Sequence, residues 1–191
     1  NPWPSVPSGC GAPDQGGGQT CYAAEGAKNL WVKAGRQWKL NLATFNTRTL
    51  SSEASLAGLF EELSGISWDI IGLSEVRRTG EAYTVLTNGH VLCYRGLPDK
   101  KESGVGFLVH NNVAGNIDEF YSINERVAVV VIKLNRRYKM KVVQAYAPTS
   151  SHDDEEIEQF YEDVELAMTK VQTQYTVVMG DFNAKVGKKQ A

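Results

Sequence analysis

The segment Tyr175-Thr-Val-Val-Met-Gly-Asp-Phe-Asn-Ala-Lys-Val-Gly187 sets the architecture that we expect the rest of the chain to follow. Its first residues, 175–179, are mostly apolar and predict a buried strand. Gly180 then permits a turn of the backbone, so that Asp181 and Asn183 emerge together at the strand end. Because sites in open α/β sheets collect beyond the carboxyl ends of strands, these two side chains indicate a functional site. The alternative is an ordinary turn, in which Asp and Asn bond the local backbone.

Upstream, a strand, a helix and a second strand are predicted in succession. Residues 38–45 alternate apolar and polar side chains, as in a half-buried strand, and lead to Asn46. A helix that begins near residues 51–52 has apolar residues three and four positions apart, at Leu56, Leu59, Phe60 and Leu63. Residues 68–74 predict a buried strand that ends on Glu75. The connection between the two strands has the length that a parallel pair requires.

The middle of the chain predicts strands that are joined by turns. The expected strands cover residues 91–94, 105–109, 127–132 and 139–146. Residues 127–132 are apolar without alternation, which is typical of a strand covered on both faces. Residues 139–146 are expected to be its antiparallel neighbour, with Tyr146 at the end.

A long helix is predicted between this strand and the Tyr175 strand. Ser151 and Asp154 have the spacing of a capping box, and the acidic residues 153–156 suit the positive end of a helix dipole. The acidic run is therefore interpreted as a helix start and not as a metal site. The expected buried stripe consists of Ile157, Phe160, Tyr161, Val164, Met168 and Val171.

Composition limits the function classes. The chain has 191 residues and a formal net charge of -2, so nucleic acid could be bound only by a local basic patch. No apolar run reaches the length of a membrane span, and no secretory signal precedes the domain, which predicts a protein that is neither secreted nor membrane-bound. Of its three cysteines, Cys93 is expected to be a buried thiol, whereas Cys10 and Cys21 are predicted to be free thiols in preference to a disulfide.

Two parts are expected along the chain. Residues 1–36 are rich in Gly and Pro and have few aliphatic side chains, which predicts a poorly ordered leader. Residues 37–191 are expected to form one folded domain. Because the chain begins with Asn1 and ends just after its strongest motif, we expect both ends to have been cut from something longer.

Four predicted strands thus end in polar residues that suit a site. An amide, a carboxylate, a phenol and an Asp-Asn pair follow them, at Asn46, Glu75, Tyr146, Asp181 and Asn183. One such strand end is unremarkable because Asp and Asn favour turns. Four of them favour a shared site over four separate turns.

Five blocks of this sequence resemble, in the same order, those of the endonuclease/exonuclease/phosphatase superfamily. They are Thr44–Leu50, Ile71–Arg77, Ser103–Val109, Gln144–Thr149 and Gly180–Gly187. Within the superfamily, they are most similar to the apurinic-type endonuclease domain of non-LTR (LINE-type) retrotransposons of the RTE or BovB branch, and to cellular proteins derived from such elements. The resemblance covers residues 38–191.

The resemblance implies a four-layer α/β sandwich of the DNase I-like type that cuts phosphodiester bonds with Mg²⁺ or Mn²⁺. Glu75 matches the metal-binding carboxylate, and Asn46 matches an amide beside the metal. Asp181 matches the carboxylate that aligns or deprotonates the attacking water. Asn183 and Tyr146 match donors to the phosphate oxygens.

The sequence also departs from the family pattern. Family members carry a further Asp and a terminal Ser-Asp-His block, and none of the histidines here, His90, His110 and His152, lies in such a block. Residues 47–48 are Thr-Arg, where many members have an acidic residue or glycine, so an auxiliary metal contact is not matched. We therefore expect that the carboxyl-terminal part of the domain is missing and that residues 1–191 alone have little or no nuclease activity.

Three functions remain open from the sequence. The first is an endonuclease domain that nicks DNA, acts inside the cell in the nucleus, and contacts phosphates through basic residues such as Arg48, Arg77 and Arg78. The loops also hold Lys100, Lys101, Arg136, Arg137 and Lys139. The second is a non-catalytic, host-adopted module that binds protein partners. The third, a phosphatase of phosphoinositides or other small phosphoesters, agrees least with the Ala-Pro-Thr and Asn-Ala-Lys-Val-Gly surroundings.

Overall fold

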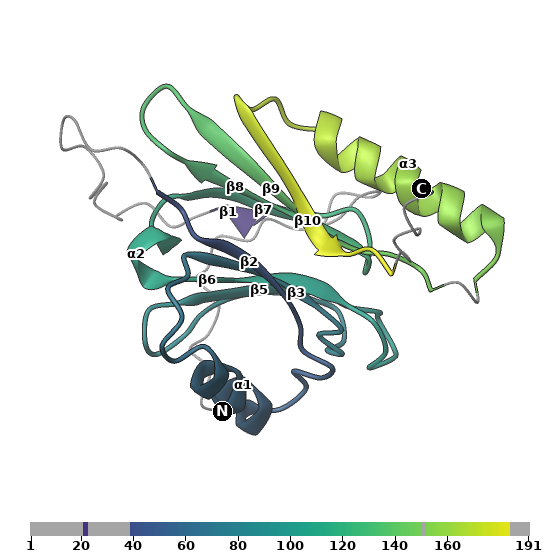
Figure 1. Ribbon diagram of the computed structural model, residues 1–191, viewed down its shortest axis with the longest axis horizontal. Helices are drawn as coiled ribbons and strands as arrows, with labels where there is room; N and C mark the ends of the chain where they lie inside the picture. Colours follow the sequence, from purple (N-terminus) through teal and green to yellow (C-terminus); the bar gives the residue numbers. More distant parts are fainter. Residues whose placement is uncertain (1–20, 23–38, 150–151, 184–191) are drawn as a thin grey trace, which may run out of the picture.

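Two β-sheets packed face to face, with one long helix outside each, make up the described part of the protein (Figure 1). The computed structural model describes residues 21–22, 39–149 and 152–183. The elements are β1 (Cys21–Tyr22), β2 (Leu42–Asn46), α1 (Glu53–Glu62), β3 (Ile70–Ser74), β4 (Glu81–Val85), β5 (Val91–Arg95), β6 (Val105–Val109), α2 (Asn111–Ala114), β7 (Ile117–Ser122), β8 (Val127–Lys133), β9 (Lys139–Tyr146), α3 (Asp154–Thr169) and β10 (Tyr175–Asp181). The order of layers is α1, sheet, sheet, α3. The predicted four-layer α/β sandwich is confirmed.

The two sheets have related topologies. In one sheet the strand order is β2-β3-β6-β5-β4, and in the other it is β1-β7-β8-β9-β10. The pairs β2/β3 and β9/β10 are parallel, and all other pairs are antiparallel. The parallel β2/β3 pair and the antiparallel β8/β9 hairpin confirm the sequence predictions. Strands β4 and β7 were not predicted, because their mixed polar sequences lack a clear period.

The predicted leader, residues 1–36, lies outside the described residues except at β1. Cys21 and Tyr22 pair there with Phe120 and Glu119 of β7. The prediction that Cys10 and Cys21 are free thiols also lies outside the described residues, because Cys10 is not described. Neither α1 nor α3, the long helices of the described part, is apolar over enough length to cross a membrane.

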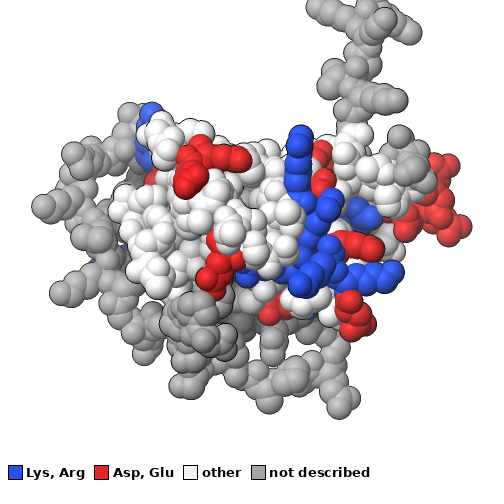
Figure 2. Space-filling model, turned by 90° about the horizontal axis from the view of Figure 1, so that it is seen from below, with Lys and Arg blue, Asp and Glu red and all other residues white. Residues whose placement is uncertain are grey.

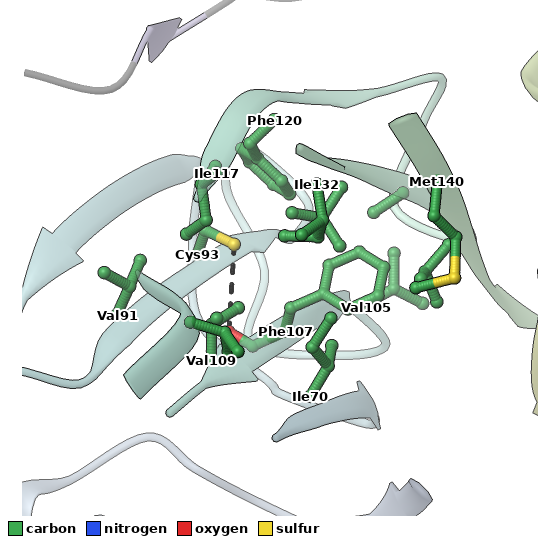
Figure 3. Close-up of a cluster of buried hydrophobic side chains, with 14 residues drawn as sticks. Ile70, Val91, Cys93, Val105, Phe107, Val109, Ile117, Phe120, Ile132 and Met140 are labelled. Carbon is green, nitrogen blue, oxygen red and sulfur yellow. Dashed lines mark hydrogen bonds between the residues drawn. The ribbon is translucent and has the colours of Figure 1, made fainter. Parts of the chain in front are cut away.

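An apolar core fills the space between the two sheets (Figure 3). Alternate residues of β8 point into it, whereas the intervening ones face α3, so this strand is covered on both faces as predicted. Cys93 is confirmed as a buried thiol, and its Sγ lies 3.8 Å from the carbonyl oxygen of Phe107. The core includes Ile70, Cys93, Phe107, Phe120, Ala128, Val130, Ile132 and Val142.

Helix α1 covers the outer face of the β2–β6 sheet. Ser52 is its N-cap, and the Ser52 and Ser55 side chains each accept a hydrogen bond from the other's backbone N–H, both at 3.1 Å. Leu56, Leu59 and Leu63 are buried against the sheet, which confirms most of the predicted stripe.

Helix α3 covers the outer face of the other sheet, although two details of its prediction are wrong. Its N-cap is Asp153, whose side chain accepts from the backbone N–H of Glu156 at 2.9 Å, and not Ser151. Tyr161 and Met168 are 56% and 45% exposed. The buried stripe contains Ala167 instead, together with Phe160 and Val164.

The C-terminus of α3 is anchored by a lysine from the sheet below. Lys141 of β9 is fully buried, and its Nζ donates to the carbonyl oxygens of Ala167 at 3.2 Å, Val171 at 2.7 Å and Met168. A positive charge here also suits the negative end of the helix dipole. Lys141 therefore fixes α3, and with it the start of β10.

Strand β10 is less buried than predicted and does not turn at Gly180. Tyr175 is 52% exposed, because within the described residues β10 pairs only with β9 and lies at the sheet edge. The strand continues through Gly180 to Asp181. A Cβ at Gly180 would lie 1.9 Å from the carbonyl oxygen of Ala145, so glycine is required by close contact between neighbouring strands.

A second close contact fixes the spacing of the two sheets near the site. Gly72 of β3 faces Gln144 of β9, and a Cβ on Gly72 would lie 1.8 Å from the Gln144 side-chain oxygen. Gln144 is fully buried, and its Nε2 donates to the hydroxyl of Thr44 at 3.2 Å. This polar bridge between the sheets holds β2 beside the end of β9.

Candidate functional site

The carboxyl ends of β2, β3, β9 and β10 meet at one end of the sandwich. Asn46 lies opposite Ser74 in the parallel β2/β3 pair, and Asp181 lies opposite Tyr146 in the parallel β9/β10 pair. Glu75 follows Ser74 directly. Residues from four distant segments are therefore brought to the same place, as the sequence predicts.

Hydrogen bonds from one amide show how closely these residues converge. The Nδ2 of Asn46 donates to Glu75 Oε1 at 2.7 Å and to Asp181 Oδ2 at 3.3 Å. The Oδ1 of Asn46 accepts from the backbone N–H of Arg48 at 2.9 Å, which fixes which way the amide faces. Two carboxylates, one from each sheet, thus face a shared space.

Tyr146 lies next to the first of these carboxylates. Its hydroxyl is 3.5 Å from Glu75 Oε1, and the guanidinium of Arg126 lies over its ring, 5.7 Å from the centroid. Burial raises the pKa of Tyr146, as do the charges of Glu75 and Asp181, while Arg126 opposes them. The phenol is therefore protonated at neutral pH and is available as a donor.

Asn183 lies beside Asp181 but is turned toward the backbone. Its Nδ2 donates to the carbonyl oxygen of Ala147 at 2.7 Å, and its backbone N–H donates to Asp181 Oδ1 at 3.2 Å. The amide carries a second N–H. Asn183 thus orients the Asp181 carboxylate, and its predicted contact with phosphate stays a prediction.

Backbone strain is concentrated around this site. Five non-glycine residues of the described part have positive φ: Arg48, Glu75, Arg77, Ser103 and Asn183. Four of them follow the strand ends just described. The fifth, Ser103, lies beside them, because its carbonyl oxygen accepts a hydrogen bond from the Arg77 backbone N–H. Such conformations persist where surrounding contacts hold them, and they are common at functional sites.

The three arginines predicted to contact phosphate have different surroundings. Arg77 forms an ion pair with Glu75, with Nη2 and Oε2 2.8 Å apart. Arg78 donates from Nε to the Leu50 carbonyl at 2.6 Å, and its guanidinium lies 5.5 Å from the ring centroid of Tyr94. Arg78 thus stabilises the loop between β2 and α1. Arg48 is exposed.

Basic side chains gather on one part of the face seen from the α1 side, with acidic side chains between them (Figure 2). The loops of residues 75–80 and 95–104 are tied together by backbone hydrogen bonds, such as that between Gly80 N and Leu97 O. They carry Arg77, Arg78, Arg95, Lys100 and Lys101. These loops lie beside the acidic pair, where a polyanion could contact both.

The three histidines have partners elsewhere. The rings of His90 and His110 lie 4.5 Å apart and pack with Trp68 at the opposite end of β3 and β6. His152 Nε2 lies 3.3 Å from Arg126 Nη2, and its Nδ1 lies 2.9 Å from the Thr149 hydroxyl. Within the described residues, His152 thus reaches the site through Arg126, whose guanidinium lies over the Tyr146 ring.

The donor set fits a small, hard divalent cation. Glu75 and Asp181 supply carboxylate oxygens as ligands, and the side chain of Glu75 is 19% exposed to water. Asn46 turns its Nδ2 toward both carboxylates and its Oδ1 toward the Arg48 N–H, so in this arrangement it orients the ligands. The described part contains no cluster of three or more His, Cys, Asp or Glu side chains suited to a metal. Mg²⁺ needs no such cluster, because it is typically held by one or two carboxylates and keeps several waters.

The sequence did not predict one ion pair of the site, that of Arg77 with Glu75, and one of its residues, Arg126. The Arg77–Glu75 ion pair has no signal in the spacing, because the left-handed backbone of both residues determines where the side chains lie. Arg126 had a usable signal. It immediately precedes β8, whose start pairs with the end of β9, so a residue there lies beside Tyr146.

Comparison with known proteins agrees with this geometry. The family model described as Endonuclease/Exonuclease/phosphatase family matches residues 40–188. Craniofacial development protein 2 from Bos taurus is 29% identical over 150 residues, which are 78% of this chain and 25% of that protein. The same protein from Tragulus javanicus is 27% identical over 150 residues, 78% of this chain and 26% of the relative. The chain thus spans about a quarter of the length of these curated relatives.

A solved structure supports the fold. The 3′-5′ exonuclease (NExo) from Neisseria meningitidis superimposes with a TM-score of 0.50 at 18% identity, over 73% of this chain and 56% of that chain. At this identity the likeness concerns the fold alone. It agrees with the predicted DNase I-like sandwich.

Proposed function

Because the chain belongs to the endonuclease/exonuclease/phosphatase family, we propose that its Glu75–Asp181 site binds a divalent cation and hydrolyses a phosphodiester bond of DNA. The observation that carries this proposal is the pair of hydrogen bonds from Asn46, which joins carboxylates of both sheets. If each strand simply ended in a structural turn, the negatively charged Glu75 and Asp181 would not be expected to share the Asn46 amide as a donor.

The residues have distinct roles in the proposed reaction. Glu75 would hold Mg²⁺ or Mn²⁺, with Asn46 beside it to orient the carboxylate, and the cation when bound would stabilise negative charge on the non-bridging phosphate oxygens. Asp181 aligns a water molecule and accepts its proton as the water oxygen attacks phosphorus in line. The opposite P–O bond to the sugar breaks, and the leaving sugar oxygen takes a proton from solvent water. Tyr146 and Asn183 donate hydrogen bonds to phosphate oxygens, and these bonds strengthen as charge develops there.

The substrate class follows from the surroundings of the site. The basic loops that carry Arg77, Lys100 and Lys101 favour a polyanion over a small phosphoester. The retrotransposon-type assignment rests on the resemblance of the five sequence blocks, and a domain of this type would nick DNA in the nucleus. A phosphoinositide substrate is less well supported, because the blocks resemble the retroelement group.

A second candidate function is a non-catalytic module derived from such a domain. The positions of the histidines favour it, because His90 and His110 pack with Trp68, and the ring nitrogens of His152 contact Arg126 and Thr149. Without an imidazole at the scissile phosphate, we expect residues 1–191 alone to show little or no turnover. The module would then bind DNA or protein partners.

One set of samples tests both functions. Affinity for a 20-base-pair DNA duplex is measured by fluorescence anisotropy in Mg²⁺ and in EDTA, for the wild type, Glu75→Ala and the control Glu62→Gln. Glu62 is an exposed acid at the end of α1. We expect Mg²⁺ to tighten binding of the wild type and of Glu62→Gln but not of Glu75→Ala. The proposed site would be refuted if the DNA affinity of the wild type were the same in Mg²⁺ and in EDTA. It would also be refuted if Glu75→Ala kept the full effect of Mg²⁺ on DNA affinity.

Plasmid nicking by the same samples separates the two candidates. Turnover in Mg²⁺ that is abolished in Glu75→Ala supports an active endonuclease and contradicts the expectation of little activity for this chain. Mg²⁺-dependent binding without nicking supports the non-catalytic module. Hydrolysis of phosphoinositide vesicles and not of DNA would favour the lipid phosphatase.

A further inference from the structure

Both oxygens of the Glu75 carboxylate are engaged within the protein. Oε1 accepts the 2.7 Å hydrogen bond from Asn46 and lies 3.5 Å from the Tyr146 hydroxyl. Oε2 forms the 2.8 Å ion pair with Arg77. The oxygen that does not accept from Asn46 is therefore the one that the guanidinium contacts.

The backbone holds the base of the Arg77 side chain beside Glu75. Residues 75 and 77 have φ values of 54° and 51°, and the Arg77 N–H donates to the Ser103 carbonyl at 2.8 Å. The guanidinium end is less constrained, because the side chain is 46% exposed. It can leave Glu75 by rotation of the side chain, without movement of the loop.

We propose that Arg77 is the internal counter-cation of this site: it neutralises Glu75 in the metal-free protein, is displaced when a divalent cation binds Glu75, and then contacts a phosphate of the DNA. The proposal rests on the proposed function, because it assumes that Glu75 binds the cation. It adds a positioning residue, and it predicts that metal binding and DNA binding are coupled through one side chain.

Physical chemistry gives the direction of each effect. A guanidinium and a divalent cation cannot share one carboxylate oxygen without repulsion, so removal of Arg77 must strengthen metal binding. Once the cation is bound, the same guanidinium is repelled from Glu75 and can form paired hydrogen bonds with a phosphate. Removal of Arg77 must therefore weaken DNA binding when metal is present.

Arg78 provides a matched control one residue away. Its Nε donates to the Leu50 carbonyl, and its guanidinium lies over the Tyr94 ring. Arg77→Ala and Arg78→Ala each remove one positive charge, so they change the long-range repulsion of a cation to a similar extent. Only Arg77→Ala removes the direct competitor. Lys101→Ala, at an exposed loop position, serves as a second control if Arg78→Ala impairs folding.

The test is a titration of Mn²⁺ into the protein without DNA, with free Mn²⁺ measured by electron paramagnetic resonance. We expect Arg77→Ala to bind Mn²⁺ about fivefold more tightly than the wild type, as expected for loss of a partly exposed ion pair. Arg78→Ala and Lys101→Ala should change the affinity by less than about twofold. The proposal would be overturned if Arg77→Ala and the controls changed the Mn²⁺ affinity equally. If Glu75→Gln still abolished Mn²⁺ binding in that case, the metal site itself would stand.

Failure of the metal site itself gives a different result. No Mn²⁺ binding by any variant, or binding that Glu75→Gln leaves unchanged, would refute both the proposed function and the role of Arg77. The second arm measures duplex affinity in Ca²⁺ and in EDTA. We expect Arg77→Ala to weaken DNA binding severalfold more in Ca²⁺ than in EDTA, and an equal loss in both would refute the released phosphate contact.

Discussion

Asn46 and Glu75 are 29 positions apart in the chain, and the amide of the first donates a 2.7 Å hydrogen bond to the carboxylate of the second. The same amide reaches Asp181, which is 135 positions away. Asn46 is itself held by the backbone N–H of Arg48. One short side chain therefore sets the distance between the two carboxylates.

Asn46→Ala should weaken the site without unfolding the protein. The alanine variant loses the donor that keeps the two carboxylates together, so we expect the Mg²⁺ needed for half-maximal enhancement of DNA binding to rise about tenfold. Because Asn46 is exposed, the free energy of unfolding should change by less than about 1 kcal/mol. Anisotropy titrations with Mg²⁺ and urea denaturation measure the two quantities, and an unchanged Mg²⁺ requirement would rule out this role.

Gly72→Ala should destabilise the sandwich. The new Cβ would lie 1.8 Å from Gln144 and 2.8 Å from Met179, so the sheets must move apart or the buried amide must be displaced. We expect a loss of about 1–3 kcal/mol in the free energy of unfolding. The matched control is Gly58→Ala in α1, where nothing lies within 4 Å of the added Cβ and a helical alanine should stabilise by about 0.5–1 kcal/mol. Urea denaturation compares the pair, and equal effects would contradict the predicted close contact between sheets.

Lys141→Met should loosen the end of α3. The substitution leaves the carbonyls of Ala167, Met168 and Val171 without their buried donor, and we expect about 2 kcal/mol of destabilisation. Lys139→Met, two residues along the same strand, removes a half-exposed partner of Asp118 and should lose less than about 1 kcal/mol. Hydrogen exchange of the last turn of α3 locates the effect. A Lys141→Met protein as stable as Lys139→Met would show that this lysine is not an anchor.

His90 should make stability depend on pH. Burial lowers the pKa of His90 below 6.5, with a further contribution from His110, and its Nδ1 accepts a 2.9 Å hydrogen bond from Asn111 that protonation would remove. The unfolded chain thus binds the proton more readily than the folded one. Neutral His90 therefore contributes fully to the free energy of unfolding when the pH is above 6.5, its pKa in the unfolded chain. This contribution is lost as the pH falls through 6.5 toward the lower pKa of His90 in the folded protein.

Urea denaturation at pH 7.5 and pH 5 tests this contribution. The His90→Gln variant should lose less stability between these two pH values than the wild type. An identical loss in both proteins would show that His90 is not the group responsible.

The sequence predicted the parts of this molecule whose signals are local. The spacing of leucines in α1 and the apolar run of β8 each reflect one burial pattern, and both were confirmed. The half-buried strand that leads to Asn46 was also confirmed, although β2 begins at Leu42 and the prediction placed its start at residue 38. The convergence of Asn46, Glu75, Tyr146 and Asp181 was also expected, because parallel neighbouring strands deliver their ends to the same edge.

What the sequence did not reveal depends on contacts between distant segments. The exposure of Tyr161 and the burial of Ala167 follow from which face α3 turns to the sheet. The need for glycine at position 180 follows from the Ala145 carbonyl of the neighbouring strand. The Arg77–Glu75 ion pair depends on two left-handed backbone conformations that no spacing rule anticipates.

A double-mutant cycle on Glu75 and Asp181 tests most directly whether the two carboxylates serve one cation. Duplex affinity in Mg²⁺ relative to EDTA is measured for the wild type, Glu75→Ala, Asp181→Ala and the double variant. If both side chains act on the same ion, either single substitution should remove most of the Mg²⁺ enhancement, and the double substitution should remove little more. Independent, additive effects, or an enhancement that survives in the double variant, would contradict a shared site.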